Sequence, residues 1–301
     1  MHSIVLALFP LIAFIVTGYI FKQKKFLSDA FWAGAERLNY FVLFPAMLFG
    51  TLLSAQINAE MLSSIVKILS LMFGIIMLVL YGLKGLFGWR NFSFGVFVQS
   101  NIRFNTYIGL AVVSSVFHAS GMILLAIVLA ISIPIVNVLS VFALTERQGI
   151  ALHQILLSLL KNPLILSCLM GIGFNLSGIV LWQGLTDYLQ QLARCSLALG
   201  LMCVGAALQF GAFKQHALSL GLNVVSRLLF IPLLAWLICQ LLHFSVLETQ
   251  VFVLFFALPT ASASYTLCKV LGGDSQLMAG IISLQTLISV LSLSCILAFL
   301  L

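Results

Sequence analysis

Ten long apolar stretches, separated by short polar loops, limit what this chain can fold into more than any other feature. They lie at about 3–21, 31–54, 61–83, 91–117, 121–144, 155–175, 184–208, 217–241, 246–268 and 275–301. Each is close to the roughly 20 residues that an α-helix needs to cross a bilayer, and each is apolar on nearly every face, unlike the alternating strands of a membrane barrel. Only 7% of the residues are charged, against about 25% in a soluble domain. The sequence therefore predicts an all-α polytopic membrane protein with ten transmembrane helices and excludes a soluble globular one.

The basic residues are distributed unequally between the two sets of predicted loops. The loops after the first, third, fifth, seventh and ninth helices hold Lys22, Lys24, Lys25, Lys84, Arg90, Arg147, Lys214 and Lys269, and the opposite loops hold no Lys or Arg. The positive-inside rule then places the basic loops in the cytoplasm and both termini outside, in the cytoplasmic membrane. The net charge of +7 is not gathered on one face, as a nucleic-acid partner would require.

The ten predicted helices divide into two sets of five, residues 1–144 and 155–301. Because a unit with an odd number of spans reverses its orientation when duplicated, this division predicts two inverted five-helix repeats, as in secondary transporters. The fourth helix of each half supports the division, since polar or small residues interrupt it at 99–109 and at 259–265. We expect these broken fourth and ninth helices to cross.

The first interruption carries an arginine near the middle of a span. Placing Arg103 there costs about 2.5–3.5 kcal/mol on insertion scales, and the neighbouring Asn101, Asn105 and Thr106 are polar groups that lipid cannot satisfy. One interpretation is that these residues, with Tyr107, hold an anionic group in an enclosed cavity. The other is that Arg103 caps backbone carbonyls of a broken helix.

The second interruption begins at a proline. Pro259 removes one helical hydrogen bond, and Thr260 and Ser262 then either satisfy the freed carbonyls or contact a ligand. If both segments unwind, the positive N-terminal ends of two half-helices point into one site; the alternative is that Pro259 only kinks its helix. Arg227 and Asn137, in the eighth and fifth helices, are secondary candidates for the same site.

Several functions are disfavoured by what the sequence lacks. The seven acidic residues fall in loops or near helix ends, which disfavours a proton or sodium antiporter built on a buried carboxylate. The six cysteines form no CxxC pair, and no HExxH, GxSxG or phosphate-loop motif is present. We therefore expect no enzyme activity, no metal and no cofactor.

Short motifs along the chain resemble a known family. They are Leu43–Leu48, Asn105–Leu110, Pro134–Leu139, Lys161–Ile165, Leu197–Gly200, and Leu258–Ala261 running on to Gly272–Asp274. In their order and spacing they resemble the auxin efflux carrier family, whose plant members export auxin and whose bacterial members move small organic acids.

The resemblance implies a scaffold domain and a transport domain, each built from both repeats, that work by elevator-like alternating access. It also implies that Asn105 contacts a substrate carboxylate, that Pro259 marks the second crossover, and that a homodimer can form through the scaffold. The chain departs from the plant pattern at Ala111, where that pattern has proline, and in a spacing from Asn105 to Gly109 that is one residue shorter. These departures leave Asn101 as an alternative carboxylate ligand.

Together these observations predict a secondary transporter that moves a small organic anion, a dicarboxylate or an aromatic acid, across the membrane. Efflux is the expected direction, because exporting one negative charge gains about 2.3 kcal/mol per 100 mV of inside-negative potential. The alternatives are a cation-coupled symporter of a small metabolite and a membrane sensor that binds a ligand without moving it.

Overall fold

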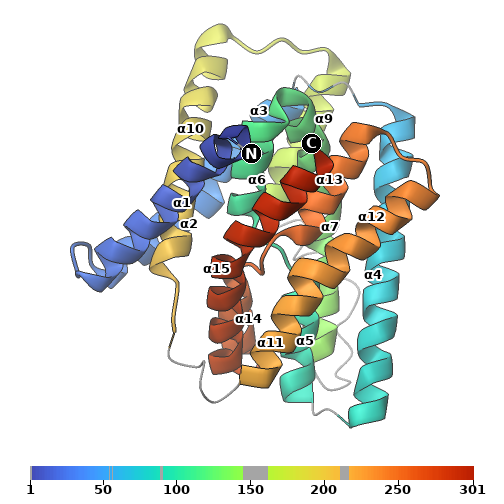
Figure 1. Ribbon diagram of the computed structural model, residues 1–301. Coiled ribbons are helices and arrows are strands. Elements are labelled where there is room, and N and C mark those ends of the chain that lie inside the picture. The colour runs from blue at the N-terminus through green and yellow to red at the C-terminus, as the bar shows by residue number, and fades with distance from the viewer. Residues whose placement is uncertain (1, 54, 56, 89–90, 145–161, 211–216) are drawn as a thin grey trace.

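A computed structural model describes residues 2–53, 55, 57–88, 91–144, 162–210 and 217–301 (Figure 1). Within these residues the secondary structure is helical and contains no β-strand, which confirms the all-α prediction. The helices are α1 (His2–Gln23), α2 (Asp29–Leu38), η1 (Asn39–Leu43), α3 (Phe44–Leu53), α4 (Ala59–Phe87), α5 (Asn91–Ile102), α6 (Thr106–Val116), α7 (His118–Leu144), α9 (Pro163–Ser177), α10 (Gln183–Ala206), α11 (Ala217–Val225), η2 (Ser226–Phe230), α12 (Ile231–Leu241), α13 (Val246–Ala257), α14 (Ala263–Val270) and α15 (Ser275–Leu300).

Five helical segments of the described chain are long and apolar enough to cross a membrane. They are α4, α7, α10, the continuous run Ala217–Leu241 and α15. Shorter apolar helices cover Leu8–Gln23, Pro163–Ser177 and Val246–Ala257. Two other predicted spans, 91–117 and 246–268, are each divided into two shorter helices, and the start of the predicted span 155–175 lies outside the described residues.

Two π-helical segments, η1 and η2, lie directly before prolines. Pro45 and Pro232 are each the second residue of the helix that follows. A proline cannot donate to the carbonyl four residues earlier, and its ring clashes with that carbonyl, so the preceding turn widens. The widened turns hold two buried polar residues, Asn39 and Arg227.

Both predicted breaks are present, and they touch each other. α5 ends at Ile102 and α6 begins at Thr106, while α13 ends at Ala257 and α14 begins at Ala263. The backbone N–H of Asn105 donates to the carbonyl of Pro259 at 2.7 Å. Both breaks are narrower than the sequence predicts, because residues 99–102 and 106–109 at the first and residues 263–265 at the second are helical.

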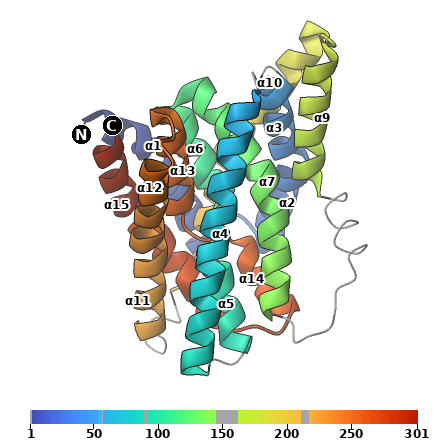
Figure 2. The same cartoon turned by 90° about the vertical axis from the view of Figure 1, so that its right-hand side faces the viewer.

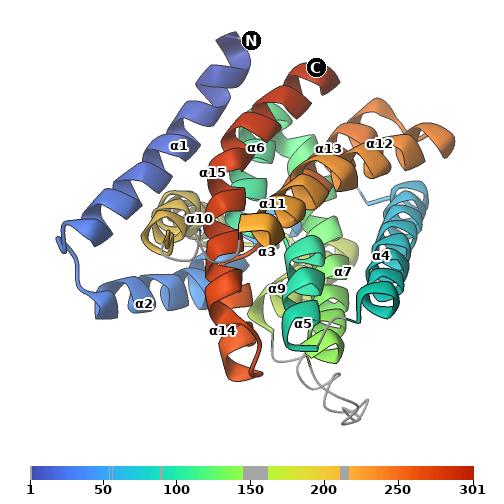
Figure 3. The same cartoon turned by 60° about the horizontal axis from the view of Figure 1, so that its bottom comes forward.

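The helices pack as two groups. The first group comprises α1, α2, η1, α3, α9 and α10, and the second comprises α4–α7 and α11–α15; contacts are denser within each group than between them. The view in Figure 3 shows α1 and α2 along one side of the molecule and α4 on the other, and α4 runs across the front of Figure 2.

Helix α1 lies unusually close to α10 because two glycines face the contact. A Cβ atom on Gly18 would overlap the carbonyl of Met202, and one on Gly205 would overlap the carbonyl of Ile15. This approach of backbone to backbone is available only without side chains, as in other small-residue helix crossings. These glycines therefore hold α1 tightly against α10 within the first group.

Candidate binding site at the helix breaks

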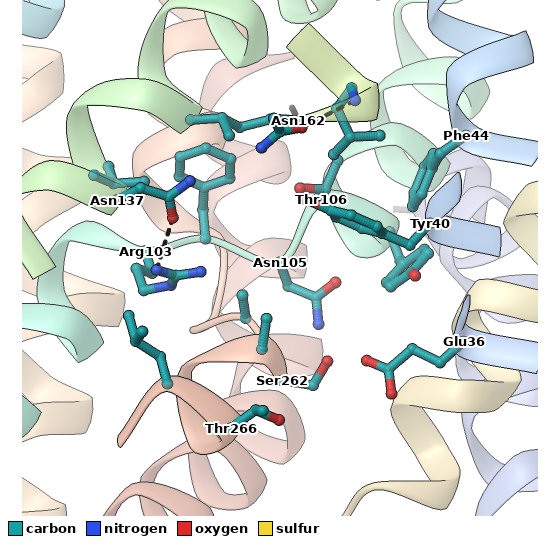
Figure 4. A pocket seen from close by; sticks show the side chains of 18 of the residues that line it. Glu36, Tyr40, Phe44, Arg103, Asn105, Thr106, Asn137, Asn162, Ser262 and Thr266 are labelled. Carbon is teal, nitrogen blue, oxygen red and sulfur yellow. Dashed lines mark hydrogen bonds between the residues drawn. The ribbon is translucent and has the colours of Figure 1, made fainter. Parts of the chain in front are cut away.

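A cavity of about 720 Å³ lies beside the first break, between the two helix groups. This volume is typical of a small-molecule site. Its polar lining comes from α2, η1, the two breaks, α6, α7, α14 and the start of α9 (Figure 4). The polar lining residues are Glu36, Arg37, Tyr40, Arg103, Asn105, Thr106, Tyr107, Asn137, Asn162, Ser262 and Thr266. The apolar lining includes Phe41, Phe44 and Phe104.

Arg103 supplies a positive charge to the cavity wall. Its Nη1 donates to Oδ1 of Asn137 at 2.9 Å, and its Nε has no hydrogen-bond partner. Among the described residues, the ion pair is Lys22–Asp29 at the surface. Arg103 therefore forms no ion pair with a carboxylate of this part of the chain. Within the residues that the structure describes, the Arg103 side chain donates to an amide and to no backbone carbonyl, which argues against the alternative that it caps a broken helix.

Asn105 presents an amide donor beside this guanidinium. Its Oδ1 accepts from the backbone N–H of Ile108 at 3.2 Å and so caps the start of α6. The Nδ2 group is buried and has no partner. Because the oxygen is used by the cap, the amide is oriented with its donor free, as a carboxylate ligand requires.

The N-terminal ends of two helices also face the cavity. Asn105 and Thr106 begin α6, Ser262 and Ala263 begin α14, and all four residues line the cavity. A helix N-terminus carries a partial positive charge and favours a nearby anion. With Arg103, these ends make this wall electropositive.

The opposite wall is a face of the α2–η1–α3 helix. Phe44 stacks on Tyr107 of α6, with ring centroids 4.5 Å apart and planes at 26°, and Tyr40 and Glu36 lie on the same side of that helix (Figure 4). The buried Asn39 holds this helix in place, since its Nδ2 donates to the carbonyl of Ser196 at 2.9 Å and its Oδ1 accepts from the Ser196 hydroxyl at 2.8 Å.

Arg227 lies behind the breaks and does not line the cavity. Its side chain is 1% exposed, with Nε donating to the carbonyl of Leu258 at 2.8 Å and Nη1 donating to the carbonyl of Asn101 at 2.6 Å. Those two carbonyls are at the C-terminal ends of α13 and α5, which carry partial negative charge. Arg227 therefore ties the two breaks together as a cation between two helix C-termini.

A ring of side chains completes this support. The Thr260 hydroxyl lies 2.8 Å from the Ser100 carbonyl and 2.7 Å from Oε1 of Gln285. Gln285 donates to Oδ1 of Asn223 at 2.7 Å, and Asn223 donates to the Ser100 hydroxyl at 2.6 Å. The Asn101 side chain accepts from Ser226 at 2.8 Å. The polar side chains of this network are thus partnered within the protein, as the interior of a bilayer demands, whereas the amide group of the neighbouring Gln99 is buried without a partner.

The predicted site residues fall into two sets. Those that line the cavity are Arg103, Asn105, Thr106, Tyr107, Ser262 and the secondary candidate Asn137; those that lie in or beside the supporting network are Asn101, Pro259, Thr260 and Arg227. Asn101, the alternative carboxylate ligand, has its amide oxygen and nitrogen bound to Ser226 and to the Phe97 carbonyl.

Sequence reasoning missed the wall formed by α2 and η1. Glu36 is one of the seven acidic residues that the sequence places in loops or near helix ends, although its spacing of four residues from Tyr40 and eight from Phe44 is typical of one helix face. Asn162, at the start of α9, was also missed. Among the described residues, no group of three His, Cys, Asp or Glu side chains could hold a metal ion.

Comparison with known families gives one match. The model of a family described as membrane transport protein matches residues 3–297, nearly the whole chain. No curated protein matches the sequence.

Proposed function

The chain belongs to the membrane transport protein family, and from this premise we propose that it is a secondary transporter of a small organic anion in the cytoplasmic membrane. The match also confirms the resemblance to the auxin efflux carriers. The observation that carries the substrate class is the cavity wall where the Arg103 guanidinium, the free Nδ2 of Asn105 and the N-termini of α6 and α14 meet. Such a wall favours a carboxylate because every contribution to it is positive or a donor.

The proposed architecture is ten membrane spans in two inverted repeats, 1–144 and 155–301. α5–α6 and α13–α14 then correspond as the broken fourth helix of each half. Two features support this: the breaks contact each other through Asn105 and Pro259, and the start of α1 lies near the end of α15 in every view (Figure 1), as an even number of crossings requires.

The proposed mechanism is alternating access of the elevator type. The first helix group would act as the scaffold and the second as the transport domain that carries the breaks. The position of the cavity between the groups supports this, because movement of one group past the other would change the side from which the bound anion is reached. The homodimer and the outside location of both termini remain part of the proposal.

The proposed direction is efflux. Moving one net negative charge outward gains about 2.3 kcal/mol per 100 mV of inside-negative potential. This gain in free energy can drive efflux of the anion without a coupling cation.

A cation-coupled symporter is the second candidate, and Glu36 is the observation that favours it. This residue adds a carboxylate to the cavity wall, and a carboxylate can bind and release a proton or sodium ion. In proteoliposomes, collapsing the proton and sodium gradients distinguishes the two candidate functions. Uncoupled efflux of the anion continues under an imposed membrane potential, whereas cation-coupled symport stops.

The main test is transport of radiolabelled mono- and dicarboxylates by protein reconstituted in liposomes. Arg103→Ala should abolish transport and leave the purified protein monodisperse, and Arg103→Lys should retain part of the activity because the charge remains. A ligand that binds should also raise the melting temperature of the wild-type protein by mass action. Full transport by Arg103→Ala would remove the guanidinium from the site and with it the proposed basis for anion recognition.

A further inference from the structure

One side of the cavity carries an acidic residue, which is unexpected in a site that binds an anion. Among the described lining residues Glu36 is the one carboxylate, and it belongs to the first helix group. The electropositive wall with Arg103 and Asn105 belongs to the second group. A bound molecule that spans the cavity from Arg103 therefore meets the Glu36 carboxylate on the side of the first group.

The helix face that carries Glu36 is directed at the breaks. Phe44, two turns further along, stacks on Tyr107 at the start of α6, and Tyr40 lies between them on the same side. In Figure 4 the Glu36 carboxylate lies beside the Ser262 hydroxyl, with Asn105 next to them and Arg103 on the far side.

The charges around Glu36 leave it available to a ligand. It forms no ion pair within the described residues. Arg37, its neighbour in sequence, also lines the cavity, but successive helical residues are about 100° apart and cannot face the same point. Arg37 instead shares its side of the helix with Ala33 and Phe41.

We infer that Glu36 is a specificity-determining residue, which selects a monocarboxylate carrying a hydrogen-bond donor at its far end and rejects a dicarboxylate. The carboxylate of the ligand binds at Arg103 and Asn105, and its hydroxyl, N–H or ammonium group donates to Glu36. A second carboxylate placed there meets a like charge in a partly desolvated cavity, where repulsion is strong. This inference rests on the proposed function and narrows its substrate class.

The test compares four flexible acids of equal chain length: pentanoate, 5-hydroxypentanoate, 5-aminopentanoate and glutarate. Each competes against a transported carboxylate in proteoliposomes, and each is also tested for a shift in melting temperature. For the wild-type protein we expect the two donor-bearing acids to compete about 10- to 100-fold better than glutarate, as expected for a site built to accept a hydrogen bond.

Glu36→Gln removes the charge at constant size and should reduce that preference to about threefold or less, chiefly by improving glutarate. Competition by pentanoate, which carries neither group, should change little. The matched control is Glu60→Gln, the same substitution at an exposed residue in the first turn of α4 that does not line the cavity, and it should leave the order of the four acids as it is in the wild type.

The outcomes separate this inference from the proposed function. If no carboxylate binds or is transported, the proposed function fails. If carboxylates are transported but glutarate competes as well as 5-hydroxypentanoate with the wild-type protein, the proposed function stands and the role of Glu36 is overturned, without recourse to any variant. If Arg37→Gln lost the binding of glutarate, the second carboxylate of glutarate would be shown to bind at Arg37, and the role of Glu36 would likewise be overturned.

Discussion

Replacing Arg227 by methionine tests whether the two helix breaks depend on one buried cation. The substitution keeps an unbranched apolar stem but leaves the carbonyls of Asn101 and Leu258 without their donor. A buried carbonyl left unsatisfied costs about 1–3 kcal/mol, so the two together should lower the free energy of unfolding by about 2–6 kcal/mol. At roughly 2 °C per kcal/mol for a chain of this size, the melting temperature should fall by roughly 4–12 °C.

The matched control is Arg103→Met, which removes the other arginine of the breaks. Arg103 has one hydrogen bond, to Asn137, and Asn137 lines a cavity where water can replace it, so the expected loss is about 1 kcal/mol or less. Arg227→Lys should fall between the wild type and the methionine variant, because one ammonium retains the charge without the two-pronged reach of a guanidinium.

The assay is the fraction of detergent-purified protein that remains monodisperse by size exclusion after heating, and transport is measured in parallel. Arg227→Met should lose stability, whereas Arg103→Met should lose transport at nearly wild-type stability. Equal melting temperatures for Arg227→Met and the wild type would refute the reasoning, since they would show that the two carbonyls do not depend on Arg227.

Three further predictions follow from single contacts. Asn105→Asp keeps the oxygen that caps α6 but loses the free donor and adds a negative charge, so transport should fall at least about tenfold while the melting temperature stays within about 2 °C of the wild type. Gly205→Ala should lower the melting temperature by at least about 4 °C because its Cβ overlaps the backbone of α1, whereas Gly173→Ala, with no atom near its Cβ, should not. The Lys22 ammonium holds the pKa of the exposed Asp29 carboxylate below its usual range. The ion pair therefore stabilises the fold above that pKa, and this stabilisation is lost as the pH falls through it. Because solvent screens the pair, Asp29→Asn should leave melting curves at pH 5 and pH 7 unchanged.

The sequence was sufficient to locate the helices and both breaks. Runs of apolar residues set the helices, because lipid leaves the backbone no alternative to helical hydrogen bonding. The breaks were visible because Pro259 and the polar run from Gln99 to Thr106 interrupt otherwise apolar segments. The width of the first break could not be read from the sequence, since Ser100 and Asn101 stay helical with hydrogen-bond partners supplied by distant helices.

The division of residues between the cavity and its support could not be read from the sequence. Asn101 and Asn105 are four residues apart and of the same type, yet Asn101 is bound on both amide atoms and Asn105 keeps its donor free. Side-chain direction changes abruptly where a helix unwinds, so helical periodicity gives no information across residues 103–105. Glu36 was missed for the opposite reason: its periodicity is regular, but its charge suggested a solvated helix end.

The two arginines of the breaks show how backbone direction assigns opposite roles to the same side chain. Arg227 lies at the C-terminal ends of α5 and α13, where the helix dipoles are negative, and these ends serve as its counter-charge within the protein. The Arg103 side chain lines the same cavity as the N-terminal residues of α6 and α14, where the dipoles are positive and add to its own charge. That arrangement is unfavourable for an empty site and favourable for one that holds an anion. The crossing of the two broken helices thus has a negative side, formed by the helix C-termini, and a positive side, formed by the helix N-termini. The buried Arg227 neutralises the negative side within the protein, and an anion that enters the cavity neutralises the positive side.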